Sequence, residues 1–314
     1  MVDHLWKLLT RELAVLLAFW MPADRRRRLE RRLRGKEEFR RLRRADCVVV
    51  SFGKSGRTWL RVLLSRFFQL RYGLRKSAFI GFDNLHRRDA RIPRIFFTHD
   101  NYLRDYTGNL DNRADFYDRR TVLLVRHPAD VAVSQYFQWK FRMRPHKKGL
   151  NKYPEHGAEV SVYDFVSDEE AGLPKVIEFM NAWARELPRV RERLVVRYED
   201  LRADTGGELG RVLRFMGQEP TAAELQDCVA FASVENMRQL EEKRTFWLAG
   251  SRMRPKDKDN PNSYKVRRAK VGGYRDYFDD AQAAALERVI EERLLPGFGY
   301  LARERAQPGA KVSA

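Results

Sequence analysis

The feature that most constrains the fold is the run from Cys47 to Leu60, CVVVSFGKSGRTWL. Four apolar residues of strand character come first, a turn with two glycines follows, and an apolar helical pattern begins at Leu60. A strand, a small-residue turn and a helix N-terminus form an anion site, because successive backbone N–H groups point outward beside the positive end of the helix dipole. Lys54 adds a full charge. The run predicts a phosphate-binding loop, with an ordinary strand-to-helix turn as the alternative.

This loop differs from the phosphate loop of kinases and related nucleotide hydrolases. That loop requires a glycine five residues before the glycine of its Gly-Lys pair, and Val48 stands at that position. No apolar strand beside the loop ends in an aspartate suited to magnesium. A P-loop kinase-like phosphotransferase, which would need ATP and magnesium, is therefore kept as an alternative enzyme class.

The charge of the chain predicts an anionic ligand or surface. The 314 residues carry a net charge of +19, and the stretch 25–44 alone holds twelve Lys or Arg and three Glu. We do not expect nucleic acid as a partner, because the charge is not interleaved with stacking aromatics and no zinc-finger or RNA-recognition signature is present. The two cysteines are far apart, which favours a reducing compartment over a disulfide scaffold or a metal site.

Residues 1–45 are predicted to form an amphipathic and Arg-rich N-terminal arm. Apolar residues recur at helical spacing over residues 1–22, but the longest apolar run, 13–22, is about half of what a bilayer span needs. One interpretation is peripheral membrane contact through residues 1–44, and a non-catalytic protein that binds membranes or polyanions is the third hypothesis. The other is a helix that packs on the domain, followed by a solvated basic linker. The expected location is cytoplasmic, alone or at the inner face of a membrane, and the oligomeric state is not indicated.

Short apolar strands alternate with helices through the rest of the chain. Strands are expected at 47–50, 94–97, 120–125 and 194–197, and helices at 60–70, from 128, and at 174–193, 207–216, 221–231 and 281–295. This alternation predicts a single α/β domain, residues 46–303, with a central parallel sheet flanked by helices and a disordered tail at 304–314. Ligands of such sheets bind at the carboxyl ends of the strands, where residues 53–58, 98–100, 126–127 and 198–200 should converge.

In this order, these strand ends resemble the sulfotransferases that use 3′-phosphoadenosine 5′-phosphosulfate (PAPS). FGKSGRTWL (52–60) is similar to the family's 5′-phosphosulfate loop, and LLVRHPADVAVSQYF (123–137) to its 3′-phosphate motif. VVRYEDL (195–201) and VRRAKVGGYRDYF (266–278) resemble two further family blocks. The resemblance covers about residues 47–300. It implies a cytosolic-type sulfotransferase domain with a P-loop-NTPase-like fold.

The resemblance also implies which residues bind PAPS and its product PAP. The loop 53–58 would hold the 5′ end. Arg126 and Ser134 would hold the 3′-phosphate, covered by the late basic loop at residues 266–278, since an arginine side chain can donate two hydrogen bonds to phosphate. Trp59 would stack on adenine, with Val234 on its other face where the family often has an aromatic residue. The implied set is Gly53, Lys54, Ser55, Gly56, Arg57, Thr58, Trp59, Arg126, Ser134, Tyr198, Ser233, Val234, Arg267, Arg268 and Ala269.

For catalysis, the resemblance implies a Lys and a His and no metal. Sulfuryl transfer is an in-line displacement that depends on positioning and charge stabilisation. Lys54 would stabilise the leaving phosphate, and His99 would take the proton of a hydroxyl or amine acceptor. Taken without the family, His99 would more often be a capping or core histidine than a catalytic one.

Two departures from the family pattern concern the reacting group. Phe97 stands where many members carry a second lysine, so we expect a replacement cation from Lys140 or the segment 141–152, and Arg57, where Thr is common, to compensate in part. The acceptor pocket is expected from residues 71–92, 141–160 and 243–265. These segments hold both aromatic and cationic residues, which fits a small-molecule, lipid or glycan acceptor.

Overall fold

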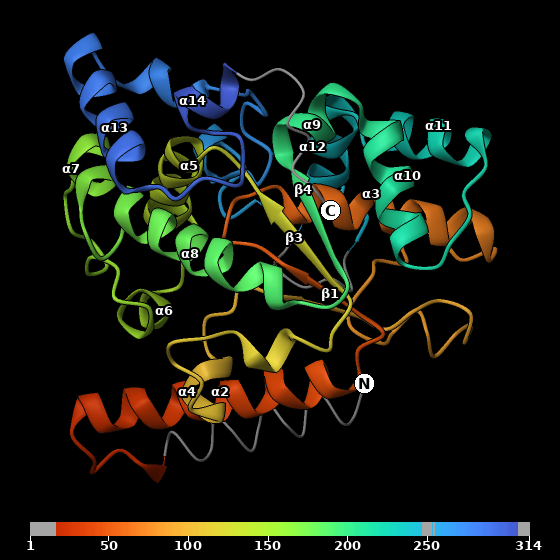
Figure 1. Cartoon of the computed structure of the whole chain (residues 1–314), viewed down its shortest axis with the longest axis horizontal. Coiled ribbons are helices and arrows are strands. Elements are labelled where there is room, and N and C mark those ends of the chain that lie inside the picture. Colours follow the sequence, from red (N-terminus) through yellow and green to blue (C-terminus); the bar gives the residue numbers. More distant parts are fainter. Residues whose placement is uncertain (1–16, 247–252, 254, 307–314) are drawn as a thin grey trace.

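The computed structural model describes residues 17–246, 253 and 255–306 (Figure 1). The described strands form one parallel sheet in the order β2-β1-β3-β4. Each strand ends within one residue of the sequence prediction. Their bounds are β1 (Cys47–Val50), β2 (Ile95–Thr98), β3 (Thr121–Val125) and β4 (Arg193–Arg197). The predicted α/β architecture is therefore confirmed.

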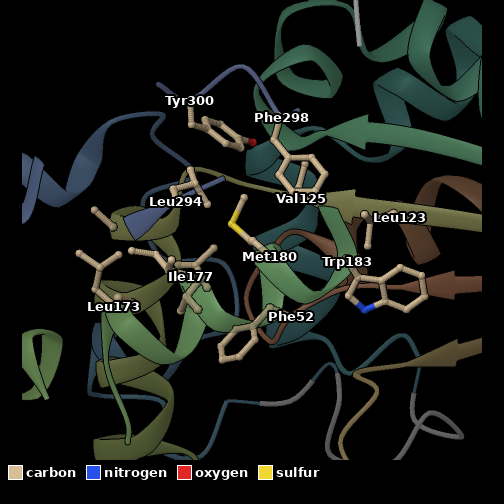
Figure 2. Close-up of a cluster of buried hydrophobic side chains, with 14 of the residues drawn as sticks. Phe52, Leu123, Val125, Leu173, Ile177, Met180, Trp183, Leu294, Phe298 and Tyr300 are labelled. Carbon is tan, nitrogen blue, oxygen red and sulfur yellow. The ribbon is translucent and has the colours of Figure 1, made fainter. Parts of the chain in front are cut away.

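Alternate strand residues enter two separate cores, because successive side chains of a strand point to opposite faces. One face places Val48, Val50 and Leu123 against α5, α8 and α13, and Figure 2 shows Leu123 and Val125 beside Met180 and Trp183 of α8. The other face places Val49 against α3 and the helices α10 to α12. The strands are buried on both faces, which explains their continuous apolar sequence.

Helices join the strands and cover both faces of the sheet (Figure 1). The α-helices beyond the arm are α3 (Arg57–Arg71), α4 (Leu103–Thr107), α5 (Pro128–Phe141), α6 (Pro145–Leu150), α7 (Val162–Ser167), α8 (Leu173–Glu186), α9 (Tyr198–Ala203), α10 (Thr205–Phe215), α11 (Ala222–Phe231), α12 (Val234–Glu242), α13 (Asp280–Arg293) and α14 (Ala302–Arg305). Short 3-10 turns are η1 (Ala114–Phe116), η2 (Leu187–Arg189), η4 (Pro261–Ser263) and η5 (Gly273–Tyr277).

The Arg-rich segment of the arm is a helix packed on the domain and not a solvated linker. Helix α2 (Ala23–Arg44) lies beside α4, as Figure 1 shows. The two helices approach closely at Gly35, where a Cβ atom would lie 2.2 Å from the carbonyl oxygen of Tyr102. Arg31 pairs with Asp105 of α4 at 2.9 Å. Ion pairs and a glycine contact hold a strongly basic helix here, which a hydrophobicity pattern does not reveal.

Parts of two further predictions lie outside the described residues. Residues 1–16 carry most of the helix expected at 1–22, and residues 307–314 most of the expected tail. No helix in the described ranges is both long enough and apolar enough to cross a bilayer.

The largest local differences from prediction are short helices. The segment 141–160 contains α6, and the helix expected at 174–193 ends at Glu186 and continues as a 3-10 turn over Leu187–Arg189. Pro188 lies in that turn and has no N–H to continue the α-helical pattern. Helices α4, α7, α9 and α12 were not predicted, because five to nine residues are too few for a clear period.

Candidate active site

The carboxyl ends of the strands open into one cavity of about 1100 Å³. Almost all of the predicted site residues line it: Gly53, Lys54, Gly56, Arg57, Thr58, Trp59, His99, Arg126, Ser134, Tyr198, Val234, Arg267, Arg268 and Ala269. Ser55 and Ser233 do not. Ser55 is buried, and the Ser233 hydroxyl accepts the Asn236 N–H as the N-cap of α12.

The loop after β1 contains two residues with positive φ angles, a conformation that restricts which residues fit there. Lys54 has φ 77° and Gly56 has φ 97°, both in the left-handed region. A Cβ atom at position 56 would lie 2.6 Å from the Tyr198 ring, so glycine lets the loop pass against that ring. Trp59, in the first turn of α3, donates its indole N–H to the carbonyl of Ala232 at 2.8 Å. The indole is thereby fixed at the cavity wall, with its ring edge-on to Tyr198 at 5.9 Å.

Lys54 lies among other cations. Removal from bulk water lowers the pKa of Lys54 well below its ordinary value, and the charges of Lys265, Arg142, Arg267 and Arg126 lower it further. Such crowding of positive charge is unfavourable unless an anion enters. The residues present therefore fit a multiply charged anionic ligand.

A second cationic position lies after β3. The guanidinium of Arg126 stacks over the Tyr198 ring at 4.3 Å and pairs with Asp130 at 3.3 Å. It also donates to the carbonyl of Lys270 at 3.0 Å, while its buried Nε has no partner among the described residues. Nη2 of Arg126 is thus held by Asp130 and the Lys270 carbonyl, and the buried Nε–H group remains as a donor for a ligand.

Asp130 ties the late loop to this position. Its carboxylate accepts the backbone N–H groups of Gly272 and Tyr274, both at 2.9 Å. Asp130 was not predicted to be a site residue, although it stands two residues after Pro128 in the 3′-phosphate motif. The residue acts as a brace that brings the late basic loop over the cavity.

The start of the late loop is anchored by a buried ion pair. Glu241 of α12 pairs with Arg142 at 3.2 Å and accepts the N–H of Lys265 at 2.8 Å. Further along, Arg267 lies over the Phe137 ring at 3.5 Å and donates to the Tyr277 hydroxyl at 2.6 Å. Arg142 and Lys265 lie in segments that were expected at the pocket, 141–160 and 243–265, but neither was predicted as a neighbour of Lys54, because their distance from it in sequence gives no sign of their proximity.

His99 follows β2 and lies half-buried at the cavity wall. Its Nδ1 lies 2.8 Å from the carbonyl oxygen of Ser51, which can only accept, so Nδ1 carries the hydrogen. Its Nε2 accepts from Nη2 of Arg57 at 2.5 Å. Removal from water and the Arg57 charge lower the pKa of His99 well below its ordinary value. The imidazole is thus neutral, with its basic nitrogen on the cavity side.

The expected replacement for the missing lysine at Phe97 is only partly present. Arg61 lies over the Phe97 ring at 4.5 Å and donates to the carbonyl of Ile80, so its charge is directed into the protein. Lys140 pairs with Glu159 at 3.0 Å and does not line the cavity, so this candidate was wrong. Arg57 and, from the segment 141–152, Lys147 and Lys152 do line it.

The side of the cavity where the acceptor was expected is built only in part from the predicted segments. Residues 71–92 do not line it, because Phe79, Ile80 and Leu85 are buried in the second core. Of the other expected segments, residues 143–153 line it, and Lys265 is the contribution of the described part of 243–265. The rest of this wall comes from α2, residues 99–113 and α8, which were not expected there. The aromatic lining is Phe52, Tyr102, Tyr153 and Phe179.

Comparison with known families decides the identity of this site. The sulfotransferase domain matches residues 44–297. The chain belongs to the sulfotransferase family. As a sulfotransferase it is an enzyme that takes its sulfuryl group from PAPS, as the resemblance implied.

Curated sulfotransferases resemble the chain over most of its length. Sulfotransferase 2A6 of Rattus norvegicus is 23% identical over 265 residues, which are 79% of this chain and 84% of the relative. Cytosolic sulfotransferase 13 of Arabidopsis thaliana is 25% identical over 296 residues, covering 88% and 84%.

Solved structures share the fold of this sulfotransferase. Mouse sulfotransferase SULT7A1 complexed with PAP has a TM-score of 0.54 at 17% identity, covering 86% of this chain and 92% of that chain. Retinol dehydratase in complex with androsterone and PAP has a TM-score of 0.52 at 19% identity, covering 79% and 80%. Within residues 17–246, 253 and 255–306, no group of three or more His, Cys, Asp or Glu side chains is placed to hold a metal.

Proposed function

We propose that this sulfotransferase transfers a sulfuryl group from PAPS to a hydroxyl or amine acceptor, with His99 as base and Lys54 as the stabiliser of the leaving phosphate. The observation that carries the proposal is the convergence of a neutral His99 and a crowded Lys54, from neighbouring strands, on one cationic cavity. When bound, PAPS supplies a sulfuryl group whose bond to the 5′-phosphate breaks as the acceptor oxygen bonds to sulfur, so that PAP leaves with the electron pair.

The cavity offers two separate anion positions for the two phosphate-bearing ends. Lys54 and the N-terminus of α3 hold the 5′ end. Arg126 and Ser134 hold the 3′-phosphate, with Arg267 and Arg268 over it from the late loop. Trp59 and Val234 line the adenine position between them.

His99 performs the proton transfer. Its Nδ1–H is held by the carbonyl of Ser51, so Nε2 is the nitrogen that accepts the proton of the acceptor. Because Arg57 donates to that same nitrogen, the acceptor hydroxyl takes the place of the guanidinium when it binds. The displaced Arg57 then faces the sulfuryl oxygens. It supplies part of the positive charge that a lysine in place of Phe97 would provide.

The arm carries the features of a membrane contact. Leu17, Phe19 and Trp20 are 62%, 76% and 72% exposed, directly before the arginines at the start of α2. Exposed apolar residues beside arginines suit the interface of an anionic bilayer. We place the enzyme in the cytoplasm, with this end of the arm as its peripheral contact, and assign catalysis to residues 46–303.

Two variants test the chemistry. We expect Lys54→Ala and His99→Ala each to lower kcat by about 100-fold or more, the size of losing one preorganised charge or a general base. Lys140→Ala and His156→Ala serve as controls, since Lys140 pairs with Glu159 outside the cavity and His156 is exposed. Retained transfer in the His99 variant would assign the base elsewhere, and ATP-dependent phosphorylation without PAP binding would favour the kinase alternative.

A further inference from the structure

The acceptor side of the cavity is more cationic than a neutral acceptor requires. Side chains from several elements place positive charge there: Arg27 and Arg31 of α2, Arg104 of α4, Lys147 of α6, and Lys175 and Arg185 of α8. The carboxylates of Asp100, Asp111, Glu178 and Glu186 line the same region. A count of charges does not decide the matter, because the pairing of each group determines what is left for a ligand.

Two of these carboxylates are already committed to the protein. Asp100 is buried and lies 2.6 Å from Arg113, which is buried as well. Glu186 accepts the backbone N–H of Arg113 at 3.0 Å and the hydroxyl of Tyr117. Asp100 thus has Arg113 as its ion-pair partner, and its charge also acts on Arg104 at longer range.

Several of the lining cations have no carboxylate partner. In the part of the chain that the structure describes, no carboxylate oxygen lies within 4.0 Å of Arg104, Lys175 or Arg185. Arg104 donates to the carbonyl of Leu110 at 2.6 Å, and its Nε is buried without a described partner. Arg104 and Lys175 are partly buried while Arg185 is exposed, so the first two are the cations that gain most from an anionic ligand.

Lys175 shows this most clearly. Its ammonium group donates to the carbonyls of Asn151 and Glu170, at 2.8 and 2.5 Å, and lies 4.3 Å from the centre of the Tyr153 ring. These contacts hold two of its three hydrogens. Burial lowers the pKa of Lys175 to about 8, although the nearby charge of Glu170 opposes this shift.

These cations lie within reach of an acceptor at the base. Tyr102 is three residues after His99, so their Cα atoms are at most about 11 Å apart. Arg31 and Lys147 both lie 5.2 Å from the centre of the Tyr102 ring, and the Tyr102 hydroxyl donates to Asn151, whose backbone carbonyl binds Lys175. The cationic wall and His99 are thus parts of one continuous site.

We propose that the acceptor is a hydroxyl compound that also carries an anionic group, a carboxylate or a phosphate, and that Lys175 and Arg104 bind this group. The inference rests on the proposed sulfotransferase function and narrows its acceptor. The aromatic lining formed by Tyr102, Tyr153 and Phe179 accommodates an apolar or ring-bearing part of the same molecule. The anionic group can belong to a soluble acid or to a lipid headgroup, since both present the same chemistry.

The test measures binding to the full chain loaded with PAP, using pairs of probes that differ in charge. The soluble pair is octyl glucuronide and octyl glucoside, and the membrane pair is vesicles with phosphatidylglycerol or with diacylglycerol. We expect the anionic member of at least one pair to bind about tenfold tighter or more, since a charge-assisted hydrogen bond has this strength. The pair that shows the preference distinguishes a free acid from a headgroup.

Variants test whether the cationic wall is the source of the preference for the anionic probe. Lys175→Gln and Arg104→Gln should each remove most of it, while Lys175→Arg retains it and the exposed Arg288→Gln on α13 leaves it unchanged. Equal affinity for both members of each pair, or a preference that survives in the Gln variants, would overturn the inference. PAP binding is measured in the same preparations. Absence of PAP binding would refute the proposed sulfotransferase function, whereas PAP binding without a charge preference would refute only the anionic acceptor.

Discussion

Nη2 of Arg57 lies 2.5 Å from Nε2 of His99, the nitrogen that a base must present to its substrate. The pair joins the phosphate loop to the end of β2, so the residue that replaces a family threonine directly contacts the candidate base. Its charge also contributes to the lowered pKa of His99.

The first prediction concerns the pH dependence of the reaction. A lowered pKa keeps His99 unprotonated below pH 6.5, so the acidic limb of kcat/KM for PAPS should lie below that value. In Arg57→Ala the positive charge is lost, the pKa of His99 rises, and the limb should move to higher pH while kcat falls about tenfold or more. An acidic limb at the same pH in Arg57→Ala would show that the contact does not tune the base.

The second prediction concerns protons taken up with the ligand. The pKa of Lys54 is lowered in the free enzyme, and an anion beside it raises that pKa, so PAP binding above neutral pH should be accompanied by proton uptake. Calorimetry at pH 8.5 in two buffers of different ionisation enthalpy measures this uptake. Lys54→Met should bind PAP more weakly and lose most of the uptake; unchanged uptake in that variant would exclude Lys54 as its source.

The third prediction concerns the brace between α5 and the late loop. Asp130→Ala removes the acceptor of two backbone N–H groups and the partner of Arg126, so the Kd for PAP should rise about tenfold or more. The exposed pair of Asp89 with Arg91 offers the control, and Asp89→Asn should change the Kd less than about twofold. An unaltered Kd in Asp130→Ala would mean that the late loop does not need this brace to bind the 3′-phosphate.

The fourth prediction concerns the docking of α2. In Gly35→Ala the new methyl group meets the Tyr102 carbonyl at 2.2 Å, so the helices must separate and the free energy of unfolding should fall by about 1–3 kcal/mol. Helix propensity alone predicts the opposite sign, a gain of up to about 1 kcal/mol. Gly149→Ala in α6 is the matched control, because nothing lies within 4 Å of its Cβ position. Urea unfolding that finds Gly35→Ala as stable as the wild type contradicts the close helix contact.

The sequence was sufficient to predict the parallel sheet and the polar residues that follow its strands. Strands β1 and β3, which pair at Val48 and Thr121, are buried on both faces of the sheet. Such strands have a nearly continuous apolar sequence, which can be recognised without the structure. Once the strands are placed, the positions of Lys54, His99 and Arg126 follow, since parallel strands end at the same edge.

The acceptor wall could not be predicted in the same way. Its cations come from α2, α4, α6 and α8, and the segment 71–92 that was expected there is held in the second core by Phe79 and Ile80. Helix α2 was also not predicted to pack on the domain, because its contacts include Gly35 and ion pairs such as Arg31 with Asp105. Of its apolar residues, Leu42 is buried in the first core and Phe39 packs against that core. Long-range contacts of charged residues leave no periodic signal.

Sulfuryl transfer from PAPS can be measured by incubating the full chain with PAPS labelled at sulfur and an extract of acceptors. Mass spectrometry then identifies what gains the sulfuryl group, and release of PAP measures the turnover. We expect a labelled organic sulfate to form together with an equal amount of PAP, and both to be lost in His99→Ala and Lys54→Ala. No labelled product from an enzyme that binds PAP, or equal yields from the wild type and both variants, would contradict the account.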